Sequence, residues 1–317
     1  MKRKLGLVSA LTAGLLMSTA GGLAAETIRM GVSIPAATHG WTGGLNWHAQ
    51  QAEQRLEEQY ENLDVVLVSA PDAARQANDL EDLVSIHDID ALVILPFESA
   101  PLTDPVRQVK DQGKFVTVVD RGLTDPDIQD LYVAGNNPER GQVSARYIEE
   151  RLGGEGKIVV LRGIPTVIDN QRVDAFMEEI ADSDIEVLGM EYANWNRDDG
   201  FKVMQDFLAR FPEIDAVWAQ DDDIALGVVE AVMQAGREDE LFILGGAGMK
   251  DIIKRVMEDD PLVPADVLYP PAMIDEAMEL TARHLVEGAP LEKEYILEAT
   301  LVTPENASEY YFPDSPF

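Results

Sequence analysis

Acidic and basic side chains stand beside aromatic ones at several points where an apolar run of the sequence ends. Asp120 and Arg121 follow one such run, and Arg172, Trp195 and Asp221 follow others farther along the chain. Aspartate and arginine form charge-assisted hydrogen bonds with neighbouring hydroxyl groups, while an aromatic face packs against C–H groups. This combination is typical of a binding site for a sugar or another polyol.

Two of these groups also have a purely structural interpretation. Asp120 and Arg121 could form only a surface ion pair, which would contribute little to stability. We place them at the end of a buried strand and therefore favour ligand contact. We expect Arg172 to begin a helix, where its charge opposes the helix dipole unless an anionic or hydroxyl partner compensates it.

The run of three aspartates from Asp221 has three interpretations. These residues could cap the next helix and stabilise its dipole. They could also bind a ligand, and we expect Asp221 to face the site while Asp222 or Asp223 forms the cap. A calcium loop is the third interpretation, but the alternating ligands and the distal glutamate of such loops are missing.

The sequence offers little support for catalysis or for a bound metal. Cysteine is absent, and the four histidines have no metal-binding spacing. Asp120, Asp221 and Glu98 could serve as the paired carboxylates of a glycoside hydrolase, but they would serve binding equally well. No nucleophile elbow, phosphate loop or dinucleotide fingerprint is present. We therefore predict a protein that is not an enzyme and that needs no cofactor and no metal.

Short apolar runs alternate with amphipathic segments along most of the chain. The alternation predicts parallel sheets covered by helices on both faces, in two similar doubly wound lobes, because the series restarts near residue 156. Ligands of such sheets bind at the carboxyl ends of the strands. The predicted strands are residues 28–34, 64–69, 91–96, 115–120, 157–162, 216–219 and 241–245, and the predicted helices are residues 44–60, 75–86, 138–152, 196–211, 224–235 and 272–286.

The charge of the chain excludes several kinds of partner. Its 317 residues carry a formal net charge of −33. Nonspecific binding to nucleic acid or to anionic lipid requires an excess of lysine and arginine, so we predict neither. A surface of this kind repels itself unless salt screens it, and a salt-rich habitat is a corresponding hypothesis.

The N-terminal segment has the three parts of a secretory signal peptide. Basic residues at positions 2–4 precede an apolar stretch, and small residues lead to Ala24 and Ala25. An uncleaved membrane anchor is the alternative, but the apolar stretch is shorter than the roughly 20 residues that span a bilayer. We expect cleavage after Ala24 or Ala25, and a periplasmic protein without direct membrane insertion.

Four segments in a fixed order resemble one family, the periplasmic sugar-binding proteins of ABC importers, in the group of the ribose-binding protein. The resemblance extends from Ile28 to about Val302 and implies the type I periplasmic binding protein fold. Its most specific segments are residues 118–121 (VVDR), 172–176 (RVDAF), 193–200 (ANWNRDDG) and 219–227 (AQDDDIALG).

The resemblance also implies which residues contact the ligand. Asp120 and Arg121 would hold hydroxyls from the first lobe, and Arg172 and Asp221 from the second. An aromatic ring would stack on the ligand from the second lobe. The full set of implied ligand contacts is His39, Trp41, Phe97, Glu98, Asp120, Arg121, Arg172, Trp195, Asp221 and Tyr269.

Two departures from the family pattern bear on the ligand. Gly246 and Ala247 replace a phenylalanine and an aspartate, and Tyr269 replaces a glutamine at the last crossing between the lobes. A site changed in this way should prefer different hydroxyl stereochemistry or a ligand of different shape. A hexose, a pentose other than ribose, and an open-chain alditol all remain possible.

The resemblance implies capture of a monosaccharide or alditol in a cleft that closes about a hinge of three chain segments. The first lobe would comprise residues 26–135 and 270–298, and the second residues 136–269 and 299–317. The loaded monomer would deliver its ligand to the membrane permease of an ABC importer. Alternatively, it would present the ligand to a chemoreceptor or sensor kinase, and the sequence does not distinguish these two partners.

Overall fold

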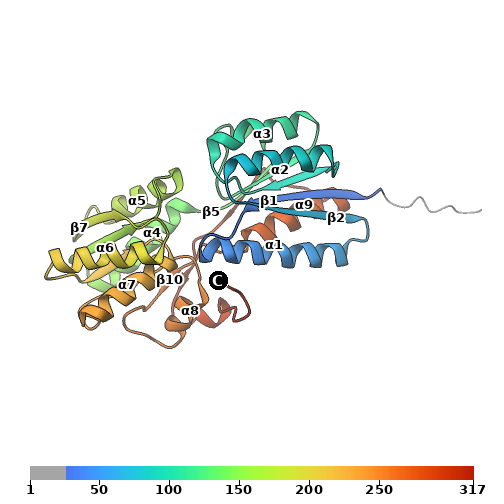
Figure 1. Ribbon diagram of the computed structural model, residues 1–317. Coiled ribbons are helices and arrows are strands. Elements are labelled where there is room, and N and C mark those ends of the chain that lie inside the picture. The colour runs from blue at the N-terminus through green and yellow to red at the C-terminus, as the bar shows by residue number, and fades with distance from the viewer. Residues whose placement is uncertain (1–25) are drawn as a thin grey trace, which may run out of the picture.

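The computed structural model describes residues 26–317, which form two α/β lobes lying side by side (Figure 1). The predicted signal peptide, residues 1–25, lies outside the described residues. Each lobe is built on a parallel sheet with helices on both faces, which confirms the predicted fold class. Two segments that follow the second sheet in sequence return to extend or cover the first.

The first sheet has six strands in the order β11-β5-β4-β3-β1-β2, all parallel. Continuous apolar runs build its centre, and every residue of β3 is buried, because helices cover both faces. Its strands are β1 (Ile28–Pro35), β2 (Leu63–Ala70), β3 (Ala91–Ile94), β4 (Phe115–Val119), β5 (Leu131–Gly135) and β11 (Glu294–Leu297).

Four helices cover this first sheet in two pairs. One face packs against α1 (Gly40–Gln59) and α9 (Met273–Glu287), and the other packs against α2 (Ala73–Ser85) and α3 (Ser99–Asp111). Each pair encloses its own apolar core. The helix α9 comes from the C-terminal part of the chain, so distant parts of the sequence complete the first lobe.

The second sheet has four strands in the order β7-β6-β8-β9. The helices α4 and α5 cover one face, where Phe176 stacks on the buried Trp218, and α6 and α7 cover the other. These elements are β6 (Glu155–Arg162), β7 (Asp184–Tyr192), β8 (Ala216–Ala219), β9 (Phe242–Leu244), α4 (Asn137–Leu152), α5 (Val167–Glu179), α6 (Arg197–Arg210), α7 (Asp222–Ala235) and α8 (Lys250–Met257).

The chain passes between the lobes at three places. It leaves the first sheet after β5, enters it again after β10 (Asp266–Val267), and leaves it a last time before β12 (Leu301–Val302). The two short strands β10 and β12 pair antiparallel, so the second and third crossings lie side by side. Two short 3-10 helices lie at Pro126–Ile128 and Ala307–Glu309.

Several element boundaries differ from the sequence prediction. The helix α1 begins at Gly40 and not at residue 44, because its glycine-rich first turn packs closely against Pro271 and Phe317, and this tertiary contact outweighs the low helix propensity of glycine. The helix α5 begins at Val167, so Arg172 is its sixth residue and not its first. The prediction that Arg172 starts a helix is therefore wrong, and the argument from the helix dipole no longer applies to it.

Within residues 26–317, none of the helices combines the length and the apolar character needed to cross a bilayer.

Candidate ligand-binding site

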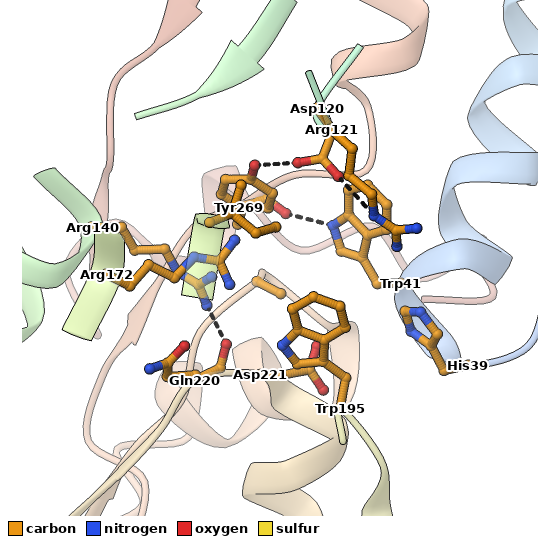
Figure 2. A pocket seen from close by; sticks show the side chains of 12 residues that line it. His39, Trp41, Asp120, Arg121, Arg140, Arg172, Trp195, Gln220, Asp221 and Tyr269 are labelled. Atoms are coloured by element: carbon orange, nitrogen blue, oxygen red, sulfur yellow. Dashed lines mark hydrogen bonds and ion pairs between the residues drawn. The ribbon is translucent and has the colours of Figure 1, made fainter. Parts of the chain in front are cut away.

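A cavity lies between the lobes at the carboxyl ends of the parallel strands (Figure 2). It measures about 30 Å³ in this conformation, which is room for a few water molecules. The cavity is therefore too small for a molecule the size of a monosaccharide. Twelve residues line the cavity: His39, Trp41, Asp120, Arg121, Arg140, Ile168, Arg172, Trp195, Gln220, Asp221, Ala247 and Tyr269.

Eight of the ten residues predicted to contact the ligand line this cavity. The other two, Phe97 and Glu98, line an adjoining cavity of about 660 Å³ between the loop after β3 and the start of α5. Arg121 and Ile168 line both cavities, so the two share part of their walls. Phe97 remains connected to the central cavity because its carbonyl oxygen accepts a hydrogen bond of 2.6 Å from Arg121.

Tyr269 occupies the centre of the site, at the second crossing between the lobes (Figure 2). Its hydroxyl donates to the carboxylate of Asp120, and its carbonyl oxygen accepts a hydrogen bond of 2.8 Å from the indole of Trp41. The guanidinium of Arg172 lies over the tyrosine ring at 4.5 Å. The tyrosine thus connects groups of both lobes through polar and cation–π contacts.

Asp120 is held in an unusual backbone conformation directly after β4. Its φ of 57° lies in the left-handed region, which costs energy for a residue with a side chain. The backbone is fixed by hydrogen bonds to Val133 and from the hydroxyl of Tyr132. Its carboxylate lies 3.9 Å from the Nε of Arg121, so the two residues form an ion pair, which is mostly buried and not the surface pair of the structural alternative. Such strain concentrates where a side chain must be aimed at a site.

Two tryptophans, one from each lobe, line the cavity. Trp41 lies in the first turn of α1, and Trp195 lies in the loop before α6 with a φ of 51°. Trp195 can lie against the end of β6 only because Gly163 has no side chain, since a Cβ there would approach the indole nitrogen to 1.9 Å. His39 lies beside Trp195, with the ring centroids 6.5 Å apart. Burial lowers the pKa of His39 to about 4, with Asp223 opposing and Arg121 adding to the shift.

Asp221 both lines the cavity and caps α7. Its carboxylate accepts hydrogen bonds from the backbone of Asp223 at 2.9 Å and of Ile224 at 3.4 Å. The expectation that Asp222 or Asp223 would form the cap is therefore wrong. Burial, followed by the nearby Asp222 and Asp223, raises the pKa of Asp221 to about 8, although Arg140 opposes the shift.

The other two aspartates of the run hold backbone groups in place. Asp222 is fully buried and accepts hydrogen bonds from the amides of Gly246, Gly248 and Met249, and so fixes the loop after β9. Asp223 accepts a hydrogen bond of 2.9 Å from the amide of Gly40 in the first lobe. An acid at the start of α1 also interacts favourably with the helix dipole, so this contact stabilises the approach of the lobes.

The structure adds Arg140 to the site, a residue that the sequence analysis did not single out. Arg140 lies in the first turn of α4, just after the first crossing, and only 3% of it is exposed. Gln220, Ile168 and Ala247 are the other additions. No apolar run ends at Arg140, so the strand-end argument could not find it. Its position directly after a predicted crossing was the available clue.

Several polar atoms of the site have no hydrogen-bond partner within the described residues. Six buried side-chain atoms of residues 26–317 lack one, and four of them belong to cavity residues: His39 Nδ1, Arg121 Nε, and both Nε2 and Oε1 of Gln220. Buried polar groups are normally paired. Their concentration here indicates a site for a ligand with several hydrogen-bonding groups.

The described residues contain no group of three or more histidine, cysteine, aspartate or glutamate side chains placed to hold a metal ion. The chemistry of the cavity is therefore that of arginine, carboxyl, amide and aromatic groups.

Comparison with known proteins identifies the family. Residues 30–290 match the model of the periplasmic binding protein domain. The chain belongs to this family. Members of the family and the relatives that match are solute-binding proteins, which confirms the prediction that the chain is not an enzyme, and they support an extracytoplasmic location.

Curated relatives of this periplasmic binding protein cover most of its length. The chain is 28% identical to the ribose import binding protein of Escherichia coli, over 95% of this chain and 98% of that protein. It is 30% identical to a xylitol-binding protein of Mycolicibacterium smegmatis, over 81% of this chain and 74% of that protein. The predicted resemblance to ribose-binding proteins is thereby confirmed.

A solved structure is similar at a comparable level. The fructose-binding periplasmic domain of a hybrid two-component system has a TM-score of 0.77 and 29% identity, and the match covers 89% of this chain and 92% of that chain. A solute-binding protein of Bacillus halodurans with bound myo-inositol has a TM-score of 0.80 at 23% identity, with 90% and 98% covered, and it confirms the two-lobe fold.

Proposed function

We propose that the protein captures a monosaccharide or alditol between its lobes and delivers it to the membrane permease of an ABC importer. The observation that carries the proposal is the set of unpartnered polar atoms on His39, Arg121 and Gln220 between two tryptophan walls. Hydroxyl groups of a polyol would form hydrogen bonds with the unpartnered polar atoms, and its C–H faces would pack against the tryptophans. The names of the ribose-binding and xylitol-binding relatives agree with this ligand class.

The proposed mechanism is closure about the three crossings. Asp120 and Arg121 hold the ligand from the first lobe, while Arg172, Trp195 and Asp221 hold it from the second. A ligand that contacts both lobes stabilises the closed state, because only that state provides both sets of contacts. We retain residues 26–135 with 270–298 and residues 136–269 with 299–317 as the proposed lobes. Phe97 and Glu98 are proposed to contact the ligand only where it extends toward the adjoining cavity.

A binding screen tests the proposal. The melting temperature of the purified protein would be measured with aldoses, alditols, inositols and amino acids, at low and high salt. A ligand that binds only the folded state adds about 2.7 kcal/mol of stability at about a hundredfold excess over its Kd. A rise with a sugar or alditol supports the proposal, whereas a rise with amino acids alone would contradict it.

Two variants test the site itself. Arg172→Met removes a cavity cation, and Asp221→Asn replaces a carboxyl group that burial keeps mainly protonated, while keeping an oxygen for the cap of α7. Arg172→Met should weaken binding of the identified ligand by about tenfold or more, since hydrogen bonds to charged groups contribute about 1.5–3 kcal/mol. Asp221→Asn should weaken it by about twofold to tenfold, since hydrogen bonds between neutral groups contribute about 0.5–1.5 kcal/mol. Arg146→Met is the matched control, because Arg146 is exposed on α4 and pairs with Glu179. Unchanged affinity in both cavity variants would refute the site.

A sensory function is the second candidate. The fructose-binding relative, which belongs to a hybrid two-component system, favours it. In that case the closed protein would contact a sensor kinase or chemoreceptor and not a permease. Pull-down of the ligand-loaded and ligand-free protein with candidate membrane partners distinguishes the two.

Export and oligomeric state belong to the same proposal. We propose a cleaved signal peptide, a periplasmic location and a monomer. The mass of the exported protein should correspond to a start at Ala25 or Glu26, and light scattering should give the mass of one chain.

A further inference from the structure

Two buried arginines lie next to each other in the cavity. Arg140 and Arg172 are each only 3% exposed, and their guanidinium groups lie 5.3 Å and 4.5 Å from the ring centroid of Tyr269. Figure 2 shows both side chains reaching from the same side toward the centre of the site. They come from α4 and α5, which pack against each other. The two positive charges therefore face the same small volume.

The direct partners of both arginines are neutral oxygen atoms. Arg172 donates from Nε to the side-chain oxygen of Asn137 at 2.8 Å, and Arg140 donates from Nη2 to the carbonyl oxygen of Gln220 at 2.8 Å. No carboxylate oxygen of residues 26–317 forms an ion pair within 4.0 Å with either one, whereas Arg162, at the end of β6, pairs with Asp169. A buried cation without a close counter-charge is strongly unfavourable, because it has lost its hydration. An anionic ligand would offset that cost.

The nearby acids interact mainly with other groups. The carboxylate of Asp120 accepts from Tyr269, and that of Asp222 accepts three backbone amides. Burial raises the pKa of Asp221 to about 8 and also raises the pKa values of Asp222 and Asp266. Burial thus disfavours negative charge on these three carboxyl groups, which lie near the two arginines.

The loop after β9 makes room for one of the cations. A Cβ at Gly246 would lie 2.2 Å from Nη2 of Arg140, so this guanidinium fits only because position 246 has no side chain. The loop itself is held by Asp222 through the amide of Gly246 at 2.7 Å. The position of the Arg140 guanidinium thus depends on the absence of a side chain at Gly246, in the loop after β9.

We propose that the preferred ligand is a polyhydroxy acid, whose carboxylate lies against Arg140 and Arg172 and whose hydroxyls bind the unpartnered atoms of Gln220 and Arg121. The planar guanidinium groups match a carboxylate, which accepts paired hydrogen bonds. The tryptophans contact the C–H groups of the chain or ring. This inference rests on the proposed function, because it specifies the class of polyol that the same site accepts.

Matched ligand pairs test the inference. Calorimetric titration would compare gluconate with glucitol, galacturonate with galactose, and glycerate with glycerol, with succinate as an acid without hydroxyls. We expect an acid to bind about tenfold or more tightly than its neutral partner. Arg140→Met and Gly246→Ala should each reduce that preference at least severalfold, the second by displacing the guanidinium. Arg140→Lys should restore part of it, and the exposed Arg146→Met should leave it unchanged.

The outcomes separate this inference from the proposed function. Tighter binding of the neutral member in every pair would overturn the acid preference and leave the proposed function standing. If folded Gly246→Ala protein prefers the acid over its neutral partner as strongly as wild type does, the proposed contact between Arg140 and the carboxylate is wrong. Succinate binding as tightly as the best hydroxy acid, or no binding by any of these acids, would overturn the inference. The proposed function would fall as well only if no sugar or alditol raised the melting temperature in the wider screen.

Discussion

At the scale of single residues, Asp221 combines two requirements in one carboxyl group. It must accept two backbone amides at the start of α7, and it must face the ligand cavity. Burial beside Asp222 and Asp223 makes its charged form unfavourable and raises its pKa to about 8. Its protonated form can donate a hydrogen bond to a ligand, which an ionised carboxylate cannot do.

Asp221 should make the folded protein less stable as the pH rises. Its pKa is about 8 in the folded state and 3.8 in the unfolded state, so the folded state retains the proton between these values. The resulting stability is complete below about pH 3.8, falls as the pH rises toward about 8 and is fully lost above that value. Urea denaturation between about pH 7 and pH 8 should therefore show a smaller fall of the midpoint in Asp221→Asn than in wild type.

The titration of His39 does not interfere with this experiment. The lowered pKa of His39 affects stability only between about 4 and 6.5, where stability rises with pH. That window lies below the one chosen for Asp221. Identical slopes for wild type and Asp221→Asn above about pH 7 would contradict the assigned pKa.

At the scale of elements, the contact between α4 and α5 positions both cavity arginines. Gly141, next to Arg140, lies directly against the backbone of α5, and a Cβ there would approach the carbonyl oxygen of Arg172 to 2.2 Å. A backbone atom cannot move aside as a flexible side chain can. The spacing of the two helices, and with it the spacing of the two cations, is therefore set by this glycine.

Gly141→Ala should force the two helices apart. Overpacking of this kind costs about 1–3 kcal/mol, and the displacement of Arg172 should also weaken ligand binding. The matched control is Gly43→Ala in α1, where nothing lies within 4 Å of a new Cβ and alanine favours a helix by up to about 1 kcal/mol. Urea denaturation of the two variants should therefore give changes of opposite sign. A stable Gly141→Ala protein with unchanged affinity would refute the role of this contact.

At the scale of the whole molecule, the C-terminal residue connects the lobes a fourth time. Phe317 is buried in the core of the first lobe, where it packs against Gly40 and Gly44, although the preceding 3-10 helix packs against α8 of the second lobe. Lys250 of α8 donates to the carbonyl oxygen of Ser315. Figure 1 shows this end of the chain between α1 and α8.

Phe317→Ala should loosen the arrangement of the lobes. Loss of a buried phenylalanine side chain costs up to about 3–5 kcal/mol in a core, and the gap can also be relieved here by lobe opening. We expect a larger radius of gyration in small-angle scattering without ligand, and a return to the compact value with saturating ligand. A variant with wild-type scattering in both states would show that this contact does not restrain the lobes. Phe312→Ala is the control, since Phe312 is exposed.

The net charge of −33 acts on the whole molecule. Repulsion among surface carboxylates opposes the compact state, and salt screens it within a Debye length of about 10 Å at about 0.1 M and about 3 Å at about 1 M. The melting temperature should therefore rise as sodium chloride increases from about 0.05 M to about 1 M. A fall over that range would contradict a stability limited by charge repulsion.

The sequence by itself determined the parallel α/β architecture and most of the candidate site. Apolar runs such as residues 91–95 encode strands buried on both faces, and parallel strands bring their carboxyl ends to one edge. Residues after separate strands, such as Asp120 and Asp221, therefore had to come close together. The local sequence pattern was sufficient to predict this arrangement, because hydrophobic periodicity identifies the strands and chain order identifies the residues that follow them.

Only the tertiary structure decided which distant residues line the site together and which of them contact one another. The hydrogen bond from Tyr269 to Asp120 joins residues 149 positions apart, and no local pattern encodes such a pair. Arg140 belongs to the cavity because Gly246 leaves space for it, and Phe317 belongs to the first core because Gly44 does. Each of these depends on the absence of a side chain on a distant segment. Such complementarity exists only once distant segments are packed against each other, which the order of strands and helices does not specify.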